Sequence, residues 1–546
     1  MVSKVMAAGL RGIQGVPVLC ECDLANGLPA FEIVGLPDAS VKEARDRVRS
    51  AVKNCGFDFP LRRITVNLAP ADLKKEGPVY DLPILLGILW ASGQIPAVSS
   101  RQAFLGELSL DGALRPVTGV LPMALALGEE GVDTLFVPRE NGAEASVAAG
   151  VKVIPVSHVK ELVDHLRGEE KLEPLPPYDY AGRREEGPDF SEVMGQESVK
   201  RALEVAAAGS HHVLLIGPPG AGKSMLARRL PSILPDLSYE EALETTKIFS
   251  VAGLMEPGEP MVVSRPFRAP HHTVSAAGLS GGGKNPRPGE ISLAHNGVLF
   301  LDELPEFRRD ALEVLRQPLE DGVVTISRVA GACSYPSRFM LVCAMNPCKC
   351  GYYGHPSGRC TCSEQSVRRY RQKISGPLLD RIDIHVEVPS VGYEELRQRK
   401  PAEPSASIRE RVNKARRIQQ ERYQGSGIHC NSRLTPGLMD RYCRPDREGE
   451  QLLRAAFQTL GLTARSYDRV LKVARTIADL AGSEQVGAEH IAEAVQFRSK
   501  SFHNILFIHG RIGCCGQQGV NCGQLCGYCG QLVDSTRFLL LSPICG

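Results

Sequence analysis

Apolar positions recur along the chain in short runs, and their spacing changes from one region to the next. Over residues 1–167, runs with strand-like spacing alternate with helix-like stretches, and Gly and Pro separate them. The strand-like runs are Val18–Cys22, Phe31–Val34 and Ile64–Leu68, and the helix-like stretches are Ser40–Cys55 and Leu121–Glu130. This mixture predicts an N-terminal α/β or α+β domain.

A different pattern occupies residues 190–388, where short runs are apolar at every position. Val213–Ile216, Val298–Leu301 and Phe339–Cys343 lack the polar alternation of a half-exposed strand, and helix-like stretches separate them. Such runs are typical of parallel strands that are covered on both faces. We therefore expect an α/β core with a parallel sheet in this region.

Polar stretches divide the chain around these two regions. Residues 168–189 are rich in Glu, Pro, Arg and Gly, which predicts a linker. Residues 389–499 begin polar and then show helical spacing, which predicts a helical lid with a C-terminal domain. Residues 500–546 interleave Cys with Gly. This break in composition indicates a second metal-binding tail or, as the favoured interpretation, a non-native terminus.

Composition narrows the class of protein without naming a partner. A chain of 546 residues is too long for one ordinary core, so about two to four domains are expected. Hydrophobic residues make up 43% and charged residues 23%, which indicates a globular protein in water. The formal net charge of +2 neither requires nor excludes nucleic acid, so any basic surface has to be local.

The apolar runs and the cysteines both favour the cytoplasm. The most apolar run, Leu82–Trp90, is far too short to cross a bilayer, and the first residues do not read as a signal peptide. We therefore expect a cytoplasmic protein that does not enter a membrane. In such a protein the seventeen cysteines are expected to be reduced thiols or metal ligands rather than disulfides.

The most specific motif is a glycine-rich turn directly after Val213–Ile216. It fits the phosphate-binding pattern G-x-x-x-x-G-K-[ST], with the residues Gly217, Pro218, Pro219, Gly220, Ala221, Gly222, Lys223 and Ser224. In this pattern backbone N–H groups face the phosphates, the lysine reaches the β- and γ-phosphates, and the hydroxyl binds Mg²⁺. Residues 225–230 continue as a helix, whose N-terminal dipole favours the same anion. We expect a nucleotide, with Mg²⁺, at this turn.

Two further strand ends supply candidates for hydrolysis. Asp302 and Glu303 follow one apolar run, where Asp302 is placed to hold Mg²⁺ and Glu303 to polarise the attacking water. Asn346 ends the next run, where its amide can hydrogen-bond the γ-phosphate or the water. The alternatives are a solvated acidic surface and an asparagine that caps a turn before Pro347. The order of turn, acidic strand and asparagine strand matches the layout of AAA+ ATPases, with Asn346 as the sensor-1 residue.

A cysteine cluster follows Asn346 in a glycine-rich loop. Its four thiols, those of Cys348, Cys350, Cys360 and Cys362, are enough for a tetrahedral Zn²⁺ site. The spacing Cys-x-Cys is tighter than the usual Cys-x₂-Cys, and His355 is a possible substitute ligand. Structural zinc and free loop thiols therefore both remain open.

Basic residues gather at two places, and two histidines are adjacent. The first helical stretch, which begins at Ser407, carries Arg409, Arg411, Lys414, Arg416, Arg417 and Arg422, and Arg368–Arg371 form a second cluster. Such runs can contact the phosphates of DNA, but most of them are only solvated helix faces. Adjacent His271 and His272 are expected to point apart and to serve a structural or inter-subunit role.

With these pieces in order, the chain resembles the ComM/YifB group of magnesium-chelatase-like AAA+ proteins from about residue 3 to 499. The resemblance is carried by long strings at 34–43, 66–78, 265–273 and 346–355. It implies that Arg381, in a Pro-Leu-Leu-Asp-Arg segment, is an arginine finger that acts on a neighbour's ATP. It also implies that Arg465 is the sensor-2 residue, which contacts the γ-phosphate. A surface salt bridge is the alternative for either arginine.

The resemblance also implies an activity and a quaternary structure. Members form a homo-hexameric ring, hydrolyse ATP between subunits and act on branched or single-stranded DNA, with branch migration in recombination and natural transformation as the implied role. The N-terminal domain resembles the Lon-protease fold, but Val79 and Leu121 stand where a catalytic serine and lysine would fall. A binding or assembly module is therefore expected there. The rival functions are a magnesium chelatase ATPase subunit and, less favoured, an ATP-dependent protease.

Overall fold

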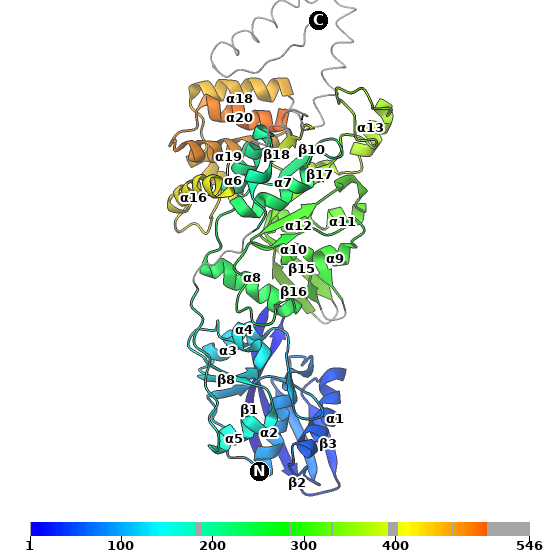
Figure 1. The fold of residues 1–546 in the computed structure, drawn as a ribbon, viewed down its shortest axis with the longest axis vertical. Helices are drawn as coiled ribbons and strands as arrows, with labels where there is room; N and C mark the ends of the chain where they lie inside the picture. The colour runs from blue at the N-terminus through cyan, green and yellow to red at the C-terminus, as the bar shows by residue number, and fades with distance from the viewer. Residues whose placement is uncertain are drawn as a thin grey trace, which may run out of the picture.

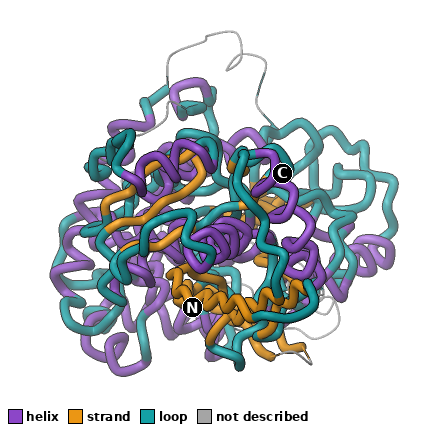
Figure 2. Tube along the Cα trace, turned by 90° about the horizontal axis from the view of Figure 1, so that it is seen from below, coloured by secondary structure: helices purple, strands orange, loops and turns teal. Residues whose placement is uncertain are grey.

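A computed structural model describes residues 2–180, 187–283, 286–328, 331–390, 392, 402–460 and 462–499. Two separate sheets and a group of C-terminal helices follow one another along the long axis of the molecule (Figure 1). Viewed from below, the strands run through the middle of the projection, with helices on either side (Figure 2). The segment 500–546, with its predicted tail, lies outside the described residues.

The N-terminal sheet has seven strands in the order β3-β4-β2-β1-β5-β8-β9, and β1, β2 and β4 pair antiparallel while the other neighbours are parallel. The strands are β1 Val2–Arg11, β2 Gln14–Ala25, β3 Ala30–Val34, β4 Arg63–Ala69, β5 Gln102–Phe104, β8 Thr134–Pro138 and β9 Lys152–Val156. A small hairpin, β6 Glu107–Leu108 and β7 Leu114–Arg115, stands apart. The helices are α1 Ala39–Asn54, α2 Asp81–Ala91, α3 Val120–Glu129, α4 Gly142–Ala145 and α5 Val159–Arg167.

These elements confirm the predicted mixture of strands and helices, with boundaries moved by a few residues. In β4 the side chains alternate between buried and partly or fully exposed positions, as expected for a strand with one face on the core. The helix predicted at Ser40–Cys55 is α1, and Asp38 caps it by accepting a hydrogen bond from the Val41 backbone. The apolar run that is too short for a membrane is α2, which lies buried against β1 and β2.

The second sheet is parallel and has the order β11-β14-β17-β10-β18. Its strands are β10 Val213–Ile216, β11 Phe267–Arg268, β14 Val298–Leu301, β17 Met340–Met345 and β18 Ile384–Glu387. Every side chain of β10, β14 and β17 is buried, which confirms the predicted apolar strands. The helices of this region are α6 Glu197–Gly209, α7 Lys223–Arg229, α8 Tyr239–Ala252, α9 Ala276–Ser280, α10 Glu290–Leu293, α11 Arg309–Glu313, α12 Arg316–Asp321, α13 Glu364–Arg371 and α14 Gly376–Leu379.

Consecutive residues of this sheet face two different cores. In β10, Val213 and Leu215 pack with α6, α7 and the C-terminal helices, whereas Leu214 and Ile216 pack with α11 and α12. The hairpin β15 Val323–Arg328 with β16 Gly331–Pro336 lies on the second face, and a shorter hairpin pairs β12 Gly281–Gly282 with β13 Arg287–Pro288. Because both faces are covered, a strand of this sheet has no polar alternation.

The C-terminal part is helical, as the spacing from Ser407 onwards predicts, and its first helix begins at Ser405. It contains α16 Ser405–Arg422, α17 Pro436–Tyr442, α18 Arg447–Leu460, α19 Ala464–Ala481 and α20 Ala488–Ser499. Helices α16 and α19 both pack on α6, so this part shares one core with the parallel sheet. Among the described residues no helix is both long enough and apolar enough to cross a membrane.

The N-terminal part contacts the parallel-sheet part through α3 and α8, which lie where the two parts meet in Figure 1. The Gly119 backbone donates a hydrogen bond to the Ser250 carbonyl at 3.0 Å. The Ser250 hydroxyl and the Leu121 backbone both donate to the buried Glu144 carboxylate, the latter at 2.9 Å. Leu121 itself belongs to a small apolar cluster shared by the two parts.

Candidate nucleotide site

The glycine-rich turn adopts a conformation that needs its glycines. Gly220 and Gly222 have φ angles of +76° and +83°, in the left-handed region that other residues rarely occupy. A Cβ on Gly217 would lie 2.3 Å from the Val388 carbonyl oxygen, so this position also excludes a side chain. The strand β10 therefore delivers the chain into a tight turn, and α7 begins at Lys223.

Gln196 supports this turn and was not singled out by any sequence motif. Its side-chain amide donates to the Ala221 carbonyl at 2.8 Å and to the Pro389 carbonyl at 3.1 Å. It therefore ties the turn to the chain that leaves β18. Its carbonyl oxygen is buried and accepts no hydrogen bond from the described part of the chain. The partners lie 25 and 193 residues away, so local patterns carry no signal for this contact.

Lys223 and Asn346 meet at the carboxyl edge of the parallel sheet. The Lys223 ammonium donates to the carbonyls of Gly217 and Pro218 at 2.8 and 2.9 Å, and to Asn346 Oδ1 at 3.1 Å. Burial lowers the pKa of Lys223, and the carboxylates of Asp302 and Glu303 act against that shift. The structure therefore brings Asn346, which directly follows β17, beside the phosphate-binding turn.

Asp302 lies beside the hydroxyl of the same turn. Ser224 donates from Oγ to Asp302 Oδ2 at 2.6 Å, and the Glu303 backbone donates to Asp302 Oδ1 at 2.9 Å. Hydroxyl and carboxylate oxygens are ligands that Mg²⁺ uses in nucleotide sites, where the ion also keeps several water ligands. The pair Ser224 and Asp302 therefore fits the predicted Mg²⁺ site.

Glu303 and His272 form the outer side of this arrangement. Glu303 has a φ angle of +52°, a strained conformation for a residue with a side chain, and its side chain is 57% exposed. The carboxylate lies 3.5 Å from Nδ1 of His272. The imidazole rings of His271 and His272 are only 4.0 Å apart, so the expectation that they point apart is wrong. The backbone that follows β11 brings both rings to the same side.

Arg381 and Arg465 lie close together, at the edge of the parallel sheet opposite the phosphate-binding turn. Arg381 precedes β18 and Arg465 opens α19, and both line a cavity of about 130 Å³ that also contains Glu320, Asp380 and Asp468. Arg381 pairs with Glu320 and donates to the Pro377 carbonyl at 2.6 Å. The parallel β10 and β18 place this cavity at their amino ends, while Lys223 follows the carboxyl end. A four-residue strand separates the two ends by roughly 13 Å.

A buried ion pair fixes the position of α19 at this edge. Arg469 Nη1 lies 2.5 Å from Asp383 Oδ1, and His211 Nδ1 lies 3.3 Å from Asp383 Oδ2. Although burial opposes it, the positive charge of Arg469 and the hydrogen bond from His211 hold the pKa of Asp383 well below its usual range. Because Arg465 lies one helical turn before Arg469, this pair also positions Arg465.

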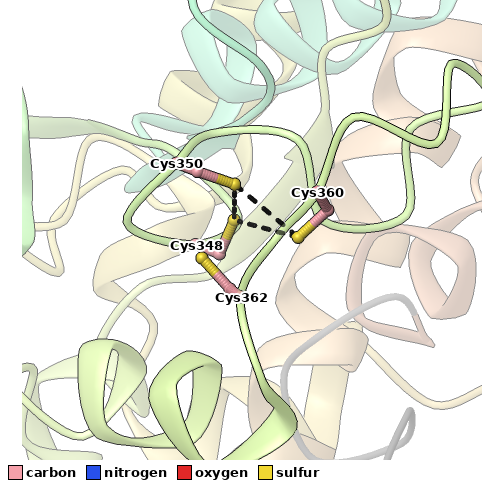
Figure 3. Close-up of side chains that lie close together, drawn as sticks. All are labelled: Cys348, Cys350, Cys360 and Cys362. Atoms are coloured by element: carbon pink, nitrogen blue, oxygen red, sulfur yellow. Dashed lines mark hydrogen bonds between the residues drawn. The ribbon is translucent and has the colours of Figure 1, made fainter.

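The four predicted cysteines converge after β17 (Figure 3). Sγ of Cys348 lies 3.3 Å from that of Cys350 and 3.8 Å from that of Cys360, and the last two are 3.6 Å apart. Including Cys362, the four sulfur atoms all lie within 4.8 Å of one another. Four sulfurs bound at about 2.3 Å to one tetrahedral metal are roughly 3.8 Å apart, so the cluster fits Zn²⁺. His355 instead hydrogen-bonds Ser357 and Ser390, so it is not the substitute ligand.

The cysteine loop packs directly on the phosphate-binding turn. Gly351 has a φ angle of +88°, and a Cβ at this position would lie 2.4 Å from Cδ of Pro219. Pro347, which follows Asn346, accepts a hydrogen bond at 3.3 Å from Arg371, whose guanidinium lies 5.3 Å from the centre of the Tyr353 ring. The cluster is therefore attached to both the turn and the strand end that carries Asn346.

Most arginines of the basic helix α16 form contacts with other parts of the protein. Arg411 pairs with Glu204 and Glu403, both at 2.5 Å, and Arg422 pairs with Asp479 at 2.6 Å. Arg409 and Arg416 donate to backbone carbonyls of the neighbouring segments. These contacts weigh against the interpretation of this cluster as a DNA-binding face, and they differ from the solvated face that was the alternative, because the arginines contact the protein itself.

The positions of a Lon-type dyad hold buried apolar side chains. Val79 is 6% exposed and Leu121 is fully buried in the apolar cluster between α3 and the region of α8. Neither side chain can act as a nucleophile or a base. Leu121 instead takes part in the contact between the two parts of the chain.

Three family models and several curated proteins match the chain. The models are magnesium chelatase, subunit ChlI, over 189–396; subunit ChlI of Mg-chelatase over 20–141; and magnesium chelatase, subunit ChlI C-terminal, over 402–498. Competence protein ComM of Haemophilus influenzae is 45% identical over 504 residues, which is 91% of this chain and 97% of that protein. The YifB protein of Escherichia coli is 44% identical with the same coverage. Lon protease of Mycoplasmopsis agalactiae is 29% identical over 135 residues, 23% of this chain and 14% of the protease.

Proposed function

The chain belongs to the magnesium-chelatase-like AAA+ family of ComM and YifB, and from that premise we propose that it is an ATP-hydrolysing ring motor that works on DNA. The observation that carries the proposal is the meeting of three strand ends at one edge of the parallel sheet. Lys223 contacts Asn346 there, and Ser224 contacts Asp302. These are the side chains that phosphoryl transfer requires for positioning and charge neutralisation.

Each residue of this edge has a distinct role in ATP hydrolysis. Lys223 holds the β- and γ-phosphates, and Ser224 with Asp302 holds Mg²⁺, which neutralises phosphate charge when it is bound. Glu303, exposed and beside His272, orients and polarises the attacking water. Asn346 exchanges its contact with Lys223 for one with the γ-phosphate or the water.

The other half of the site comes from a neighbouring subunit. Arg381 and Arg465 face a shared cavity at the amino edge of the sheet, remote from Lys223 of the same chain. In a head-to-tail ring this edge meets the next subunit's phosphate-binding turn. An arginine finger supplied in this way is worth about 10³–10⁵ in turnover. A homo-hexamer is the ring that the family resemblance favours.

DNA as the substrate follows from the family. ComM is named a competence protein, and branch migration of recombination intermediates in the cytoplasm is the role we propose here. A magnesium chelatase ATPase subunit is the alternative, because its family models match three parts of the chain. A protease is disfavoured, since Val79 and Leu121 are buried and apolar. Zn²⁺ at the four cysteines is proposed as a structural metal.

The test is ATP hydrolysis in the presence of branched DNA. We expect branched DNA to stimulate hydrolysis in the unmodified protein and Glu303→Gln to abolish hydrolysis while the ring still binds ATP and DNA. Absence of DNA binding by the ATP-bound Glu303→Gln ring would refute the DNA motor. Metal insertion into a porphyrin with a partner subunit would instead establish the chelatase function.

A further inference from the structure

A cleft in the N-terminal part of the molecule lies outside the nucleotide site. It has a volume of about 360 Å³ and lies between α1, β3 and the loop that precedes β4. Its lining includes the side chains Phe31, Arg45, Asp46, Arg49, Phe59 and Arg62. In Figure 1 both α1 and β3 lie in the part of the molecule farthest from the C-terminal helices. The volume falls in the range of sites that bind small ligands or single nucleotide units.

The cleft has a surplus of positive charge. Arg45, Arg49 and Arg62 are exposed, and within the described part of the chain none of them forms an ion pair. Two neighbouring arginines differ, because Arg47 pairs with Asp81 and Arg63 with Glu32. The lining contains three guanidinium groups and only one carboxylate, that of Asp46.

The surplus extends along the exposed face of α1. Lys42, Arg45, Arg49 and Lys53 are exposed and recur at three- and four-residue spacing, so they lie in one row along the helix. The buried positions Val41, Ala44 and Val48 lie on the adjacent face, so the row runs along one side of the buried face. The row forms a path for a polyanion, and the cleft lies beside it.

Aromatic rings form the other wall of the cleft. The rings of Phe31 and Phe59 are 6.0 Å apart, and the Arg49 guanidinium lies 5.5 Å from the centre of the Phe59 ring. Both phenylalanines are partly exposed, and Leu61 beside them is 79% exposed. Flat apolar surfaces next to guanidinium groups are suited to stacking nucleobases, whereas an acidic peptide would use only the charge.

We propose that this cleft binds single-stranded DNA, with phosphates on the arginines and a base against the phenylalanine rings. A single strand fits better than a duplex, because only unstacked bases can reach an aromatic wall. The inference rests on the proposed DNA motor and gives it a DNA contact far from the ATP site.

The test measures binding of a fluorescein-labelled oligothymidylate of about 16 nucleotides to the full-length Glu303→Gln protein with ATP. The test variant adds Arg45→Glu and Arg49→Glu. The matched control adds Lys152→Glu and Lys171→Glu, two exposed lysines of β9 and of the segment after α5, both outside the cleft lining and the basic row. We expect at least a tenfold loss of affinity in the test variant and less than a twofold loss in the control.

Two further measurements separate a phosphate and base contact from general charge. Loss of two phosphate contacts should reduce the slope of log K against log salt by about 1.4. Phe59→Ala, which changes no charge, should weaken binding by about fivefold or more, because base–aromatic stacking contributes at least that much. Melting curves of the variants establish that the domain remains folded.

The possible failures can be told apart. In one case the parent Glu303→Gln protein binds the oligonucleotide, but the cleft variants bind it equally well or lose no more affinity than the control. The cleft inference is then wrong, while the DNA motor stands. If the cleft variants bind the oligonucleotide normally but no longer have the mass of a hexamer, the cleft is a contact with a second copy of the chain, which also overturns the inference. If the parent binds no DNA, both proposals fail together.

Discussion

The contact between the cysteine loop and the phosphate-binding turn can be tested with one methyl group. Gly351→Ala adds a Cβ that would lie 2.4 Å from Cδ and 2.7 Å from Cγ of Pro219. Gly354→Ala is the matched control, because Gly354 lies in the same loop with a φ angle of +75° and nothing within 4 Å of the added atom. Both variants pay the same backbone cost for a side chain in the left-handed region, about 1–2 kcal/mol.

The difference between the two variants therefore isolates the steric effect. Carbon atoms in contact lie about 3.5–4.0 Å apart, so the two loops have to separate by roughly 1 Å in Gly351→Ala. A displacement of about 1 Å in a catalytic arrangement can reduce its rate about 100-fold. We expect kcat/KM for ATP to fall between about tenfold and 100-fold in Gly351→Ala.

The assay is steady-state ATP hydrolysis over a range of ATP concentrations, together with binding of a fluorescent ATP analogue. Gly354→Ala should lie within about twofold of the unmodified protein, since its added methyl group meets open space. Equal kinetics for the two variants would show that the cysteine loop does not support the turn, and our reasoning from the Pro219 contact would be wrong.

Three further predictions concern stability, domain contact and metal. Arg469→Ala should lower the free energy of unfolding by about 3–5 kcal/mol at pH 7, because it leaves Asp383 buried without its ion pair. The pKa of Asp383 is lower in the folded than in the unfolded protein, so this stabilisation is complete above about pH 4 and is lost as the pH falls further. If urea unfolding shows that Arg469→Ala lowers the free energy of unfolding equally at pH 7 and pH 3, this reasoning is contradicted. Leu121→Lys should separate the two parts and so increase limited proteolysis near Tyr178 and Tyr180, which pack on the same apolar cluster, whereas Leu110→Lys, at a 57% exposed leucine, should not; identical digestion patterns would contradict this. The purified protein should carry about one Zn²⁺ per chain and Cys348→Ser should lose most of it; metal analysis that finds no zinc in either protein would favour free thiols.

Sequence patterns predicted three of the five strands of the parallel sheet, β10, β14 and β17, because burial on both faces leaves a simple signature, but they did not predict β11 and β18. Val213–Ile216 and Val298–Leu301 have the predicted bounds, and the third strand shifts from Phe339–Cys343 to Met340–Met345. The meeting of Lys223 with Asn346 also follows from sequence, since parallel strands present their carboxyl ends at one edge.

Contacts between distant segments could not be predicted in the same way. Three contacts of the site join segments that share no periodicity. They are the hydrogen bond from Gln196 to the turn, the approach of His272 to Glu303 and the packing of Gly351 on Pro219. The basic run on α16 looks like a binding surface in sequence, because the glutamates and carbonyls that engage its arginines lie on other elements.

The central claim, a nucleotide site completed by a neighbouring subunit, is tested most directly by mixing two inactive variants. Lys223→Ala removes the proposed phosphate contact and Arg381→Ala removes the proposed arginine finger, so each homo-oligomer should hydrolyse almost no ATP. In a random mixture about a quarter of the interfaces pair an intact Lys223 with an intact Arg381 from the next subunit. We predict that hydrolysis recovers to about that fraction on mixing. A mixture as inactive as its components, although mass measurement shows mixed rings, would contradict the account, because Arg381 would then act within its own subunit.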